Sequence, residues 1–154
     1  MLAVFDIDGV VADVRHRLHH LHGRKNWPAF FRDADRDGLL AEGARLSADL
    51  GRDHEVVWLS GRPEWLRDVT ADWLARHGLP ASEIHLRPLR DYRPAAQFKV
   101  GVLRRLAARR IAAFVDDDEQ VIAAARRAGF PAVLADWVPR TAELRDAQDR
   151  EGRT

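Results

Sequence analysis

The 154-residue sequence contains no cysteine, and only one methionine and one tyrosine. Without cysteine the chain has no disulfides, no thiolate metal ligands and no cysteine nucleophile. It also has little net charge: 25 Lys and Arg residues face 24 Asp and Glu residues, for a formal net charge of +1. No global basic field would recruit a polyanion, so any contact with a nucleic acid must come from a local patch.

Long apolar runs are missing as well. The apolar start, residues 1–5, is too short to cross a membrane, and acids at Asp6 and Asp8 interrupt it where a signal peptide would stay apolar. We therefore expect no membrane contact and a cytoplasmic location. A hydrophobic content of 46% and a charged content of 32% suit a globular protein, and the length suits one domain with a substantial core.

Apolar runs of strand length alternate with segments of helical periodicity. Strands are expected at 4–7, 55–59, 84–87, 111–115 and 132–135, and helices from Asn26 onward and over 39–52, 63–77, 94–110 and 119–127. This alternation predicts an α/β fold, a Rossmann-like three-layer sandwich with a central parallel sheet. We expect one domain over residues 1–140, followed by a charged tail, 141–154, that forms a solvated helix with a loose end.

Two carboxylates, Asp6 and Asp8, follow the first predicted strand. Because side chains alternate along a strand, the intervening Ile7 can turn into the core while both acids reach one pocket. A carboxylate beside a metal can attack phosphorus and form an acyl-phosphate. A second carboxyl, held protonated, can protonate the leaving alkoxide and later activate water. The alternative is a pair of surface acids that cap a turn.

A second acidic cluster, Asp116-Asp117-Asp118, follows the strand expected at 111–115. If the two acid-ended strands lie side by side in a parallel sheet, their acids converge and repel each other unless a hard divalent cation binds between them. We therefore expect Asp116 and Asp117 to complete a magnesium site. The same run also suits a helix N-cap, a role for which Asp118 is the better candidate.

Ser60-Gly61-Arg62 is expected to form the turn after the strand at 55–59. A hydroxyl, backbone N–H groups and a guanidinium at a strand-to-helix turn suit a phosphate, helped by the N-terminal field of the next helix. Lys99 is one of only two lysines in an arginine-rich chain. It could offset the charge of substrate and acids, or it could be a solvated surface residue.

The segment from Arg15 to Phe31 mixes cations with rings, as does a phosphate track with stacking platforms. The alternative is a helix that packs Leu18, Leu21, Trp27 and Phe30 inward beneath a wet basic face. No cysteine or acid stands at ligand spacing near the four histidines of this segment, which disfavours zinc. Three further arginines could contact a substrate backbone or solvate their loop: Arg87, Arg90 and Arg93.

Together these residues resemble the haloacid dehalogenase superfamily of phosphohydrolases. Its four ordered motifs match Phe5-Asp6-Ile7-Asp8-Gly9, Leu59-Ser60-Gly61-Arg62, Lys99 and Val115-Asp116-Asp117, which span nearly the whole chain. The resemblance implies that Asp6 is the nucleophile, and that Asp8 is the general acid/base and offers its backbone carbonyl to Mg²⁺. It also implies that Ser60 and Lys99 hold the transferring phosphoryl group, and that the metal site comprises Asp6, Asp8, Asp116 and Asp117.

A closer similarity is to the 3′-phosphatase module of polynucleotide kinase–phosphatases. There the second motif reads Ser-Gly-Arg, and the fourth resembles Val115-Asp116-Asp117 with Gln120-Val121 and Arg126-Arg127-Ala128-Gly129 after it. The resemblance implies that Gly61 and Arg62 also bind phosphate. It further implies that a small cap at about 12–38 leaves the site open, and that the substrate is the 3′ end of DNA or RNA.

The chain also departs from this module. Val10 stands where Thr often follows the Asp-Gly pair, and no Gly-x-x-x-x-Gly-Lys-Ser/Thr loop occurs, so a kinase or ligase would be a separate partner. A small-molecule phosphatase of the nucleotide type is the alternative enzyme. A non-catalytic phosphate-binding module is the alternative from another class, and a protonatable Asp8 argues against it because mere binding needs no such group.

Overall fold

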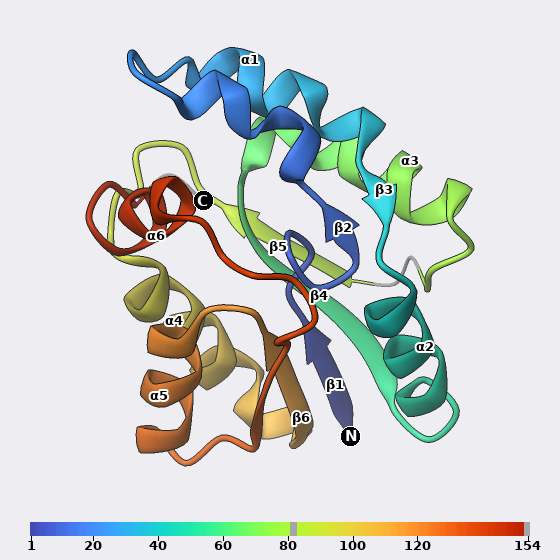
Figure 1. Ribbon diagram of the computed structural model, residues 1–154. Coiled ribbons are helices and arrows are strands. Elements are labelled where there is room, and N and C mark those ends of the chain that lie inside the picture. Colours follow the sequence, from blue (N-terminus) through green and yellow to red (C-terminus); the bar gives the residue numbers. More distant parts are fainter. Residues whose placement is uncertain (81–82, 153–154) are drawn as a thin grey trace.

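A five-stranded parallel sheet forms the centre of the protein, in a computed structural model that describes residues 1–80 and 83–152. The strands stand in the order β5-β4-β1-β6-β7. Their bounds are β1 Leu2–Phe5, β4 Glu55–Pro63, β5 Glu83–Arg87, β6 Ile111–Asp116 and β7 Ala132–Leu134. The central strand, β1, pairs in parallel with both β4 and β6 (Figure 1). The two acid-ended strands are therefore neighbours.

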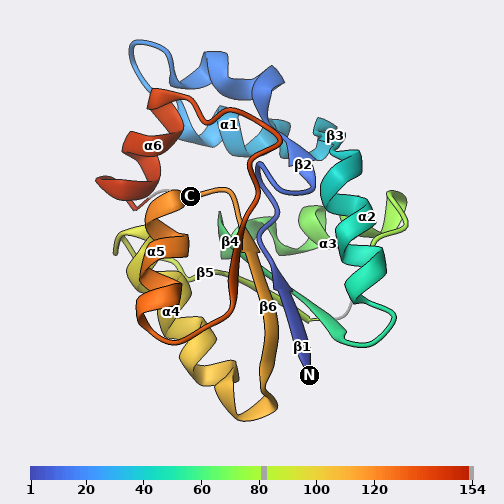
Figure 2. The same ribbon diagram turned by 60° about the horizontal axis from the view of Figure 1, so that its bottom comes forward.

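Alternation along β1 divides the core into two layers. Leu2 and Val4 join the cluster beneath α4 (Ala95–Leu106) and α5 (Glu119–Arg127). Ala3 and Phe5 join the cluster beneath α2 (Ala41–Leu50) and α3 (Arg67–Arg76). Figure 2 shows the two helix pairs on opposite sides of the sheet. The predicted three-layer α/β sandwich is confirmed.

Local signals set several helix ends. Asn26 caps α1 (Trp27–Arg32), its side chain accepting a hydrogen bond from the Ala29 N–H at 3.1 Å. After α3 the chain turns at Gly78, whose φ of +66° favours glycine. A short 3-10 turn, η4 (Ala107–Arg109), extends α4. No helix within the two described ranges has the length and apolar character needed to cross a bilayer.

The turn expected at Ser60-Gly61-Arg62 is wrong. Strand β4 continues through these residues to Pro63, and a 3-10 turn, η3 (Glu64–Leu66), separates it from α3. The register with β5 shifts between Leu59 and Pro63, where Pro63 pairs with Arg87, so the chain stays extended and buried. Ser60 and Arg62 therefore do not lie at the N-terminus of α3.

A helical insertion, residues 14–37, lies over the carboxyl ends of the strands (Figure 1, top). It comprises η1 (Arg15–Leu21), α1 and η2 (Asp33–Arg36), and it is bounded by β2 (Ala12–Asp13) and β3 (Gly38–Leu39), which pair antiparallel. Leu18, Leu21 and Phe30 are buried. These three side chains pack inward, as the alternative to a stacking surface predicted, while Trp27 is only partly buried.

The helix of the charged tail, α6 (Ala142–Asp149), packs against this insertion rather than standing in solvent. Leu144 joins the cluster of Leu18, Leu21 and Phe30, and Ala147 is fully buried. The two lie three residues apart and so share one helix face, a short apolar stripe that the charged composition obscured. The last two residues of the predicted tail, 153–154, lie outside the described ranges.

Candidate active site

The acids that follow β1 and β6 meet at the carboxyl edge of the sheet. One carboxylate oxygen each from Asp6, Asp116 and Asp117 lies within 4.8 Å of the others. Lys99 Nζ, from α4, donates to Asp6 Oδ2 and to Asp116 Oδ2, each at 2.7 Å. Gly9 makes room for this arrangement: its φ is +77°, and a Cβ there would overlap the Asp117 carboxylate. We call Asp6, Lys99, Asp116 and Asp117 the acid cluster.

Burial controls protonation in the acid cluster. It raises the pKa of Asp6, although Lys99 opposes the shift. Burial, opposed by Lys99 and reinforced by Asp6, raises the pKa of Asp116 to about 7. Asp117 has its pKa raised well above the ordinary value by burial and then by the neighbouring acids. Burial alone would lower the pKa of Lys99, but attraction to Asp116 and Asp6 raises it, so the cluster keeps one firm cation among three acids.

This donor set fits magnesium. All three acids offer carboxylate oxygens, the ligands that hard divalent cations prefer. Asp117 Oδ1 is buried and has no hydrogen-bond partner within the described part of the chain, which leaves an acceptor that a cation would satisfy. The Asp8 side chain is not in this group, so that residue would contribute only the backbone carbonyl that the resemblance implies.

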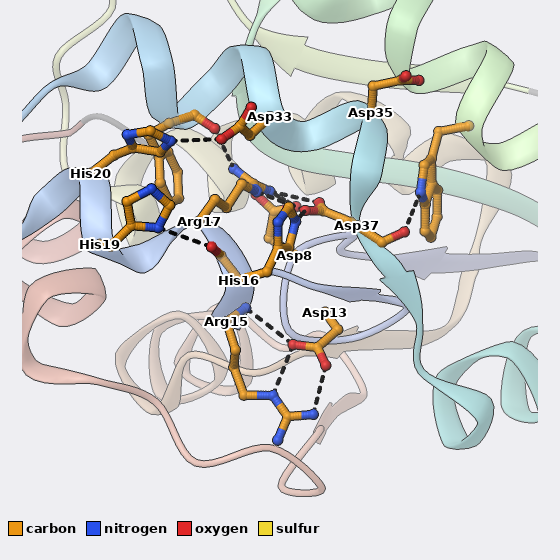
Figure 3. Close-up of polar contacts among 12 residues, drawn as sticks. Asp8, Asp13, Arg15, His16, Arg17, His19, His20, Asp33, Asp35 and Asp37 are labelled. Carbon is orange, nitrogen blue, oxygen red and sulfur yellow. Dashed lines mark hydrogen bonds and ion pairs between the residues drawn. The ribbon is translucent and has the colours of Figure 1, made fainter.

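Asp8 lies in a different environment, which we call the Asp8 clamp: Asp8, Arg17, Arg62 and Asp37. Asp8 Oδ1 accepts from Arg62 Nε at 2.9 Å, from Arg62 Nη2 at 2.7 Å and from Arg17 Nη2 at 3.1 Å. Arg17 donates to both oxygens of Asp37, each at 2.8 Å, and Arg62 Nη2 donates to Asp37 Oδ2 at 2.8 Å. Figure 3 shows Arg17 directed toward Asp8 and Asp37.

The clamp moves the pKa of Asp8 downward. Burial would raise this pKa, but Arg62 and Arg17 outweigh it, so Asp8 stands as a carboxylate. The expectation of a protonated carboxyl is not met in this arrangement, because the sequence did not reveal two guanidinium groups on one oxygen. The other oxygen, Asp8 Oδ2, is buried and has no hydrogen-bond partner among residues 1–80 and 83–152.

Ser60 and Gly61 are buried on β4, the strand next to β1. The Ser60 hydroxyl accepts the Arg62 N–H at 3.3 Å, and Arg62 Nη1 donates to Thr70 Oγ1 at 3.2 Å. The sequence-predicted residues thus divide into three places at one edge of the sheet. They are the acid cluster, the clamp with Asp8 and Arg62, and the buried Ser60-Gly61 pair.

Two members of the clamp had no distinguishing signal in the sequence. Arg17 looked like one of several cations on a wet face, but it is fully buried, with its guanidinium carbon 4.3 Å from the centre of the Phe30 ring. Asp37 accepts from His16 Nε2 at 2.7 Å through its side chain and from Trp73 Nε1 at 2.8 Å through its carbonyl. Only the contact between insertion and sheet identifies them.

Asp118 takes the capping role that the sequence predicted. Its Oδ1 accepts from the N–H groups of Gln120 at 2.8 Å and Val121 at 3.3 Å, at the start of α5. Its Oδ2 accepts from Arg140 Nη2 at 3.1 Å. The acidic triplet therefore serves two purposes, since Asp116 and Asp117 face the acid cluster while Asp118 fixes the helix.

The histidines and the three further arginines are also placed by tertiary contacts. The fold brings Asp33 to His20, with 2.6 Å between Asp33 Oδ2 and His20 Nε2, and to His19, so an acid does lie near these histidines although spacing offered none (Figure 3). Arg87 is buried, with its guanidinium carbon 4.8 Å from the centre of the Phe98 ring. The exposed Arg93 pairs with Asp91, with 2.6 Å between Arg93 Nη2 and Asp91 Oδ2. Arg90 lies in the loop between Arg87 and Arg93.

Comparison with known proteins agrees with this architecture. The family model of the phosphatase domain of polynucleotide kinase PNKP matches residues 1–136, whereas no curated protein matches the sequence. A structure of the Pnkp1/Rnl/Hen1 complex contains a similar chain, with 25% identity and a TM-score of 0.65 over 86% of this chain and 45% of that one. Another, described as the Pnkp1/Rnl/Hen1 RNA repair complex, gives 24% identity and a TM-score of 0.66 over 86% and 42%.

A haloacid dehalogenase-like hydrolase, SP0104 from Streptococcus pneumoniae, shares the fold with a TM-score of 0.63 and 14% identity, over 97% of this chain and 91% of that one. The match to SP0104 therefore covers nearly the whole of both chains. By contrast, the present chain spans less than half the length of the chains it matches in the two Pnkp1/Rnl/Hen1 structures.

Proposed function

Because the chain belongs to the family of polynucleotide kinase phosphatase domains, among the haloacid dehalogenase hydrolases, we propose that it is a magnesium-dependent phosphatase acting through an aspartyl-phosphate on Asp6. The membership confirms the resemblance drawn from the four motifs and the enzyme class, a phosphoric monoester hydrolase. The substrate that we propose is the 3′-phosphate at the end of DNA or RNA.

One observation carries the proposal. Two of the three buried carboxylates, Asp6 and Asp116, share the single ammonium group of Lys99. Asp117 Oδ2 lies 3.7 Å from Arg140 Nε, which also neighbours Asp118, and Asp117 Oδ1 has no hydrogen-bond partner in the described residues. Such an excess of buried negative charge is costly unless a cation joins it. Magnesium bound by Asp6, Asp116 and Asp117 would neutralise charge and so let an anionic nucleophile and an anionic phosphate approach each other.

In the proposed reaction an Asp6 oxygen attacks phosphorus, and the bond between phosphorus and the leaving oxygen breaks. Lys99 holds Asp6 and offers positive charge to the phosphoryl oxygens, with Ser60 on the neighbouring strand. The leaving alkoxide takes a proton from Asp8 Oδ2, the oxygen that the arginines leave unoccupied. Asp8 then accepts a proton from water, the water oxygen attacks phosphorus, and the bond to Asp6 breaks to release inorganic phosphate.

Asp8 needs a proton at the first of these steps, although the clamp lowers its pKa. A phosphate beside Asp8 adds negative charge and draws on the N–H donors of Arg62, and both effects raise the pKa of a neighbouring carboxyl. We propose that the bound substrate itself thereby brings Asp8 to the protonated form.

The insertion at 12–38 is proposed to serve as a small cap that leaves the site open to the end of a polynucleotide. Arg17 comes from this insertion and is buried against Asp8. We therefore propose that the clamp forms only when the cap lies in place over the sheet. A separate kinase or ligase partner and a cytoplasmic location complete the proposal. The partner is supported by the similarity to a chain in the Pnkp1/Rnl/Hen1 RNA repair complex.

The test is phosphate release from 3′-phosphorylated oligonucleotides, 5′-phosphorylated oligonucleotides and mononucleotides, each with Mg²⁺ and with EDTA. We expect Mg²⁺-dependent release that is fastest from 3′-phosphorylated oligonucleotides and falls steeply with salt. The variant Asp6→Asn should be inactive, and Asp49→Asn, an exposed acid on α2, is its matched control. Activity in EDTA or in Asp6→Asn contradicts the mechanism, whereas a preference for mononucleotides contradicts only the substrate.

A further inference from the structure

We infer that a pocket beside the Asp8 clamp binds the base of the nucleotide that carries the 3′-phosphate. This inference rests on the proposed function and adds a substrate subsite to it. The pocket has a volume of about 220 Å³. Its walls come from α1, from the end of β4 with η3, and from the loop after β5, and the residues that define it here are Trp27, Phe31, Pro63, Trp65, Arg87, Leu89, Arg90 and Tyr92. We call it the aromatic pocket.

The rings of the pocket are arranged around an open face. Trp27 stacks on Phe31, with 5.8 Å between ring centres and 28° between planes. Trp65 meets Phe31 edge to face at 6.0 Å and is 52% exposed. Tyr92, in the loop after β5, is 58% exposed. Nucleobases stack on such rings whatever their sequence, because each base has a π-face.

Exposed apolar side chains gather here rather than being scattered. Six large hydrophobic residues are exposed within the described ranges, and three of them, Trp65, Leu89 and Tyr92, line this one pocket. Single exposed hydrophobic residues need no explanation, but a concentration of them marks a binding surface. An apolar, planar ligand would cover these side chains.

The pocket adjoins the clamp on two walls. Pro63 directly follows Arg62, whose guanidinium binds Asp8. Phe31 directly follows Phe30, whose carbonyl accepts from Arg17 Nη1 at 3.3 Å. Consecutive Cα atoms are about 3.8 Å apart, so the pocket begins one residue away from the groups that hold the general acid/base.

Charge and backbone geometry favour a nucleotide over an uncharged aromatic ligand. Arg87 and Arg90 line the pocket beside the rings, together with one acid, Asp91, which lies 3.7 Å from Arg87 and pairs with Arg93 at 2.6 Å. Cations interleaved with rings suit a phosphodiester chain with stacked bases. Arg90 also has a φ of +66°, in the left-handed region that non-glycine residues rarely occupy. Such conformations persist where surrounding structure enforces them, and they cluster at ligand clamps.

The experiment compares two 3′-phosphorylated oligonucleotides that differ only at the last residue, which carries either a base or a tetrahydrofuran abasic analogue. We expect the wild-type enzyme to favour the base-bearing substrate by roughly tenfold to a hundredfold in kcat/KM, mainly through KM, as stacking of one base would give. In Trp65→Ala this ratio should fall to near one, and Trp65→Phe should restore most of it. Val133→Ala, an exposed residue of β7 outside the pocket, is the matched control.

Equal turnover of the two substrates by the wild-type enzyme overturns the inference and leaves the proposed function standing. If the enzyme releases phosphate from p-nitrophenyl phosphate but from neither oligonucleotide, the proposed substrate fails, and a binding experiment then decides the subsite. Tryptophan fluorescence of Asp6→Asn is titrated with a nucleoside 3′-monophosphate and with ribose 3-phosphate. Quenching by the nucleotide alone, lost when Trp65→Phe is added, supports the base subsite, and equal or absent quenching overturns it.

Discussion

Asp6 and Asp8 are two residues apart, both are buried, and their pKa values move in opposite directions. In the acid cluster, burial raises the pKa of Asp6, and Lys99, which Asp6 shares with Asp116, offsets only part of that rise. In the clamp, Arg62 and Arg17 overcome burial and lower the pKa of Asp8. Identical side chains two positions apart therefore have opposite electrostatic environments, and the neighbouring groups rather than the residue type assign the role.

The two regions also differ in origin. The acid cluster is built from β1, β6 and α4, which are elements of the sheet and its covering layer. The clamp takes Arg17 and Asp37 from the insertion or its border, Arg62 from β4, and Asp8 from the chain just after β1. A metal site in the scaffold and a proton-transfer group that depends on the cap can be perturbed separately.

The largest expected effect lies on the acid-cluster side. Asp6→Asn should lower kcat by roughly 10⁴-fold or more, because it removes the nucleophile. It should not lower the melting temperature, since it removes negative charge from a crowded site. Asp37→Asn, in the clamp, should keep measurable turnover. Phosphate-release kinetics and thermal unfolding check both, and comparable losses of kcat in the two variants would erase the distinction between the regions.

A matched pair of cation deletions should sharpen the comparison next. Lys99→Met removes the ammonium group that Asp6 and Asp116 share, and Arg17→Met leaves Asp8 and Asp37 with Arg62 as their remaining arginine. In EDTA both should lower the free energy of unfolding, by about 3–5 kcal/mol for Lys99→Met and by less for Arg17→Met. Millimolar Mg²⁺ should restore part of the loss in Lys99→Met, because binding to the native state stabilises it. It should restore none in Arg17→Met. Urea unfolding with and without Mg²⁺ measures this, and equal rescue of both variants would contradict a metal site confined to the acid cluster.

Asp116 in the acid cluster and Asp8 in the clamp should respond oppositely to pH in EDTA, whereas burial raises the pKa of Asp37 in the clamp as it raises that of Asp116. Asp116, with its pKa raised from 3.8 to about 7, contributes stability that is full below pH 3.8 and is lost as pH rises toward 7. Asp8, with its pKa lowered, contributes stability that is present above pH 3.8 and is lost as pH falls through its folded value. Each group changes the free energy of unfolding by at most about 1.4 kcal/mol per pH unit.

Variants separate these two limbs of the pH profile. Asp117→Asn should flatten the loss toward neutral pH, since it removes a group whose own pKa is raised well above the ordinary value by burial. Asp8→Asn should flatten the loss toward acid. Urea unfolding from about pH 2 to 8 provides the measurement, and if both substitutions altered the same limb, the opposite pKa shifts would be wrong.

The smallest effect concerns the border of the acid cluster. Asp118→Ala removes the N-cap of α5 and should lower the free energy of unfolding by about 1 kcal/mol, whereas Asp118→Asn should keep most of the cap. Neither should change the dependence of kcat on Mg²⁺ concentration, because Asp118 is not in the group of converging oxygens. A shift in the Mg²⁺ requirement of Asp118→Asn would assign this residue to the metal site instead.

Much of the framework could be predicted from local patterns. Apolar runs located the five strands of the sheet, Asn26 marked the start of α1, and the acids after β1 and β6 placed charge at one sheet edge. Strand β4 was harder, since Ser60-Gly61-Arg62 has the composition of a turn. It stays extended because Pro63 pairs with Arg87 on β5, a contact that no pattern within β4 contains.

The sequence by itself determined that acids would follow two of the strands, because periodicity and strand ends are properties of short segments. Only the tertiary structure decided what each acid faces. Lys99 reaches Asp6 from 93 residues away, and Arg62 reaches Asp8 from 54 residues away. The electrostatic field at a buried carboxylate depends on charges within a few ångströms, and folding brings those charges from distant parts of the chain.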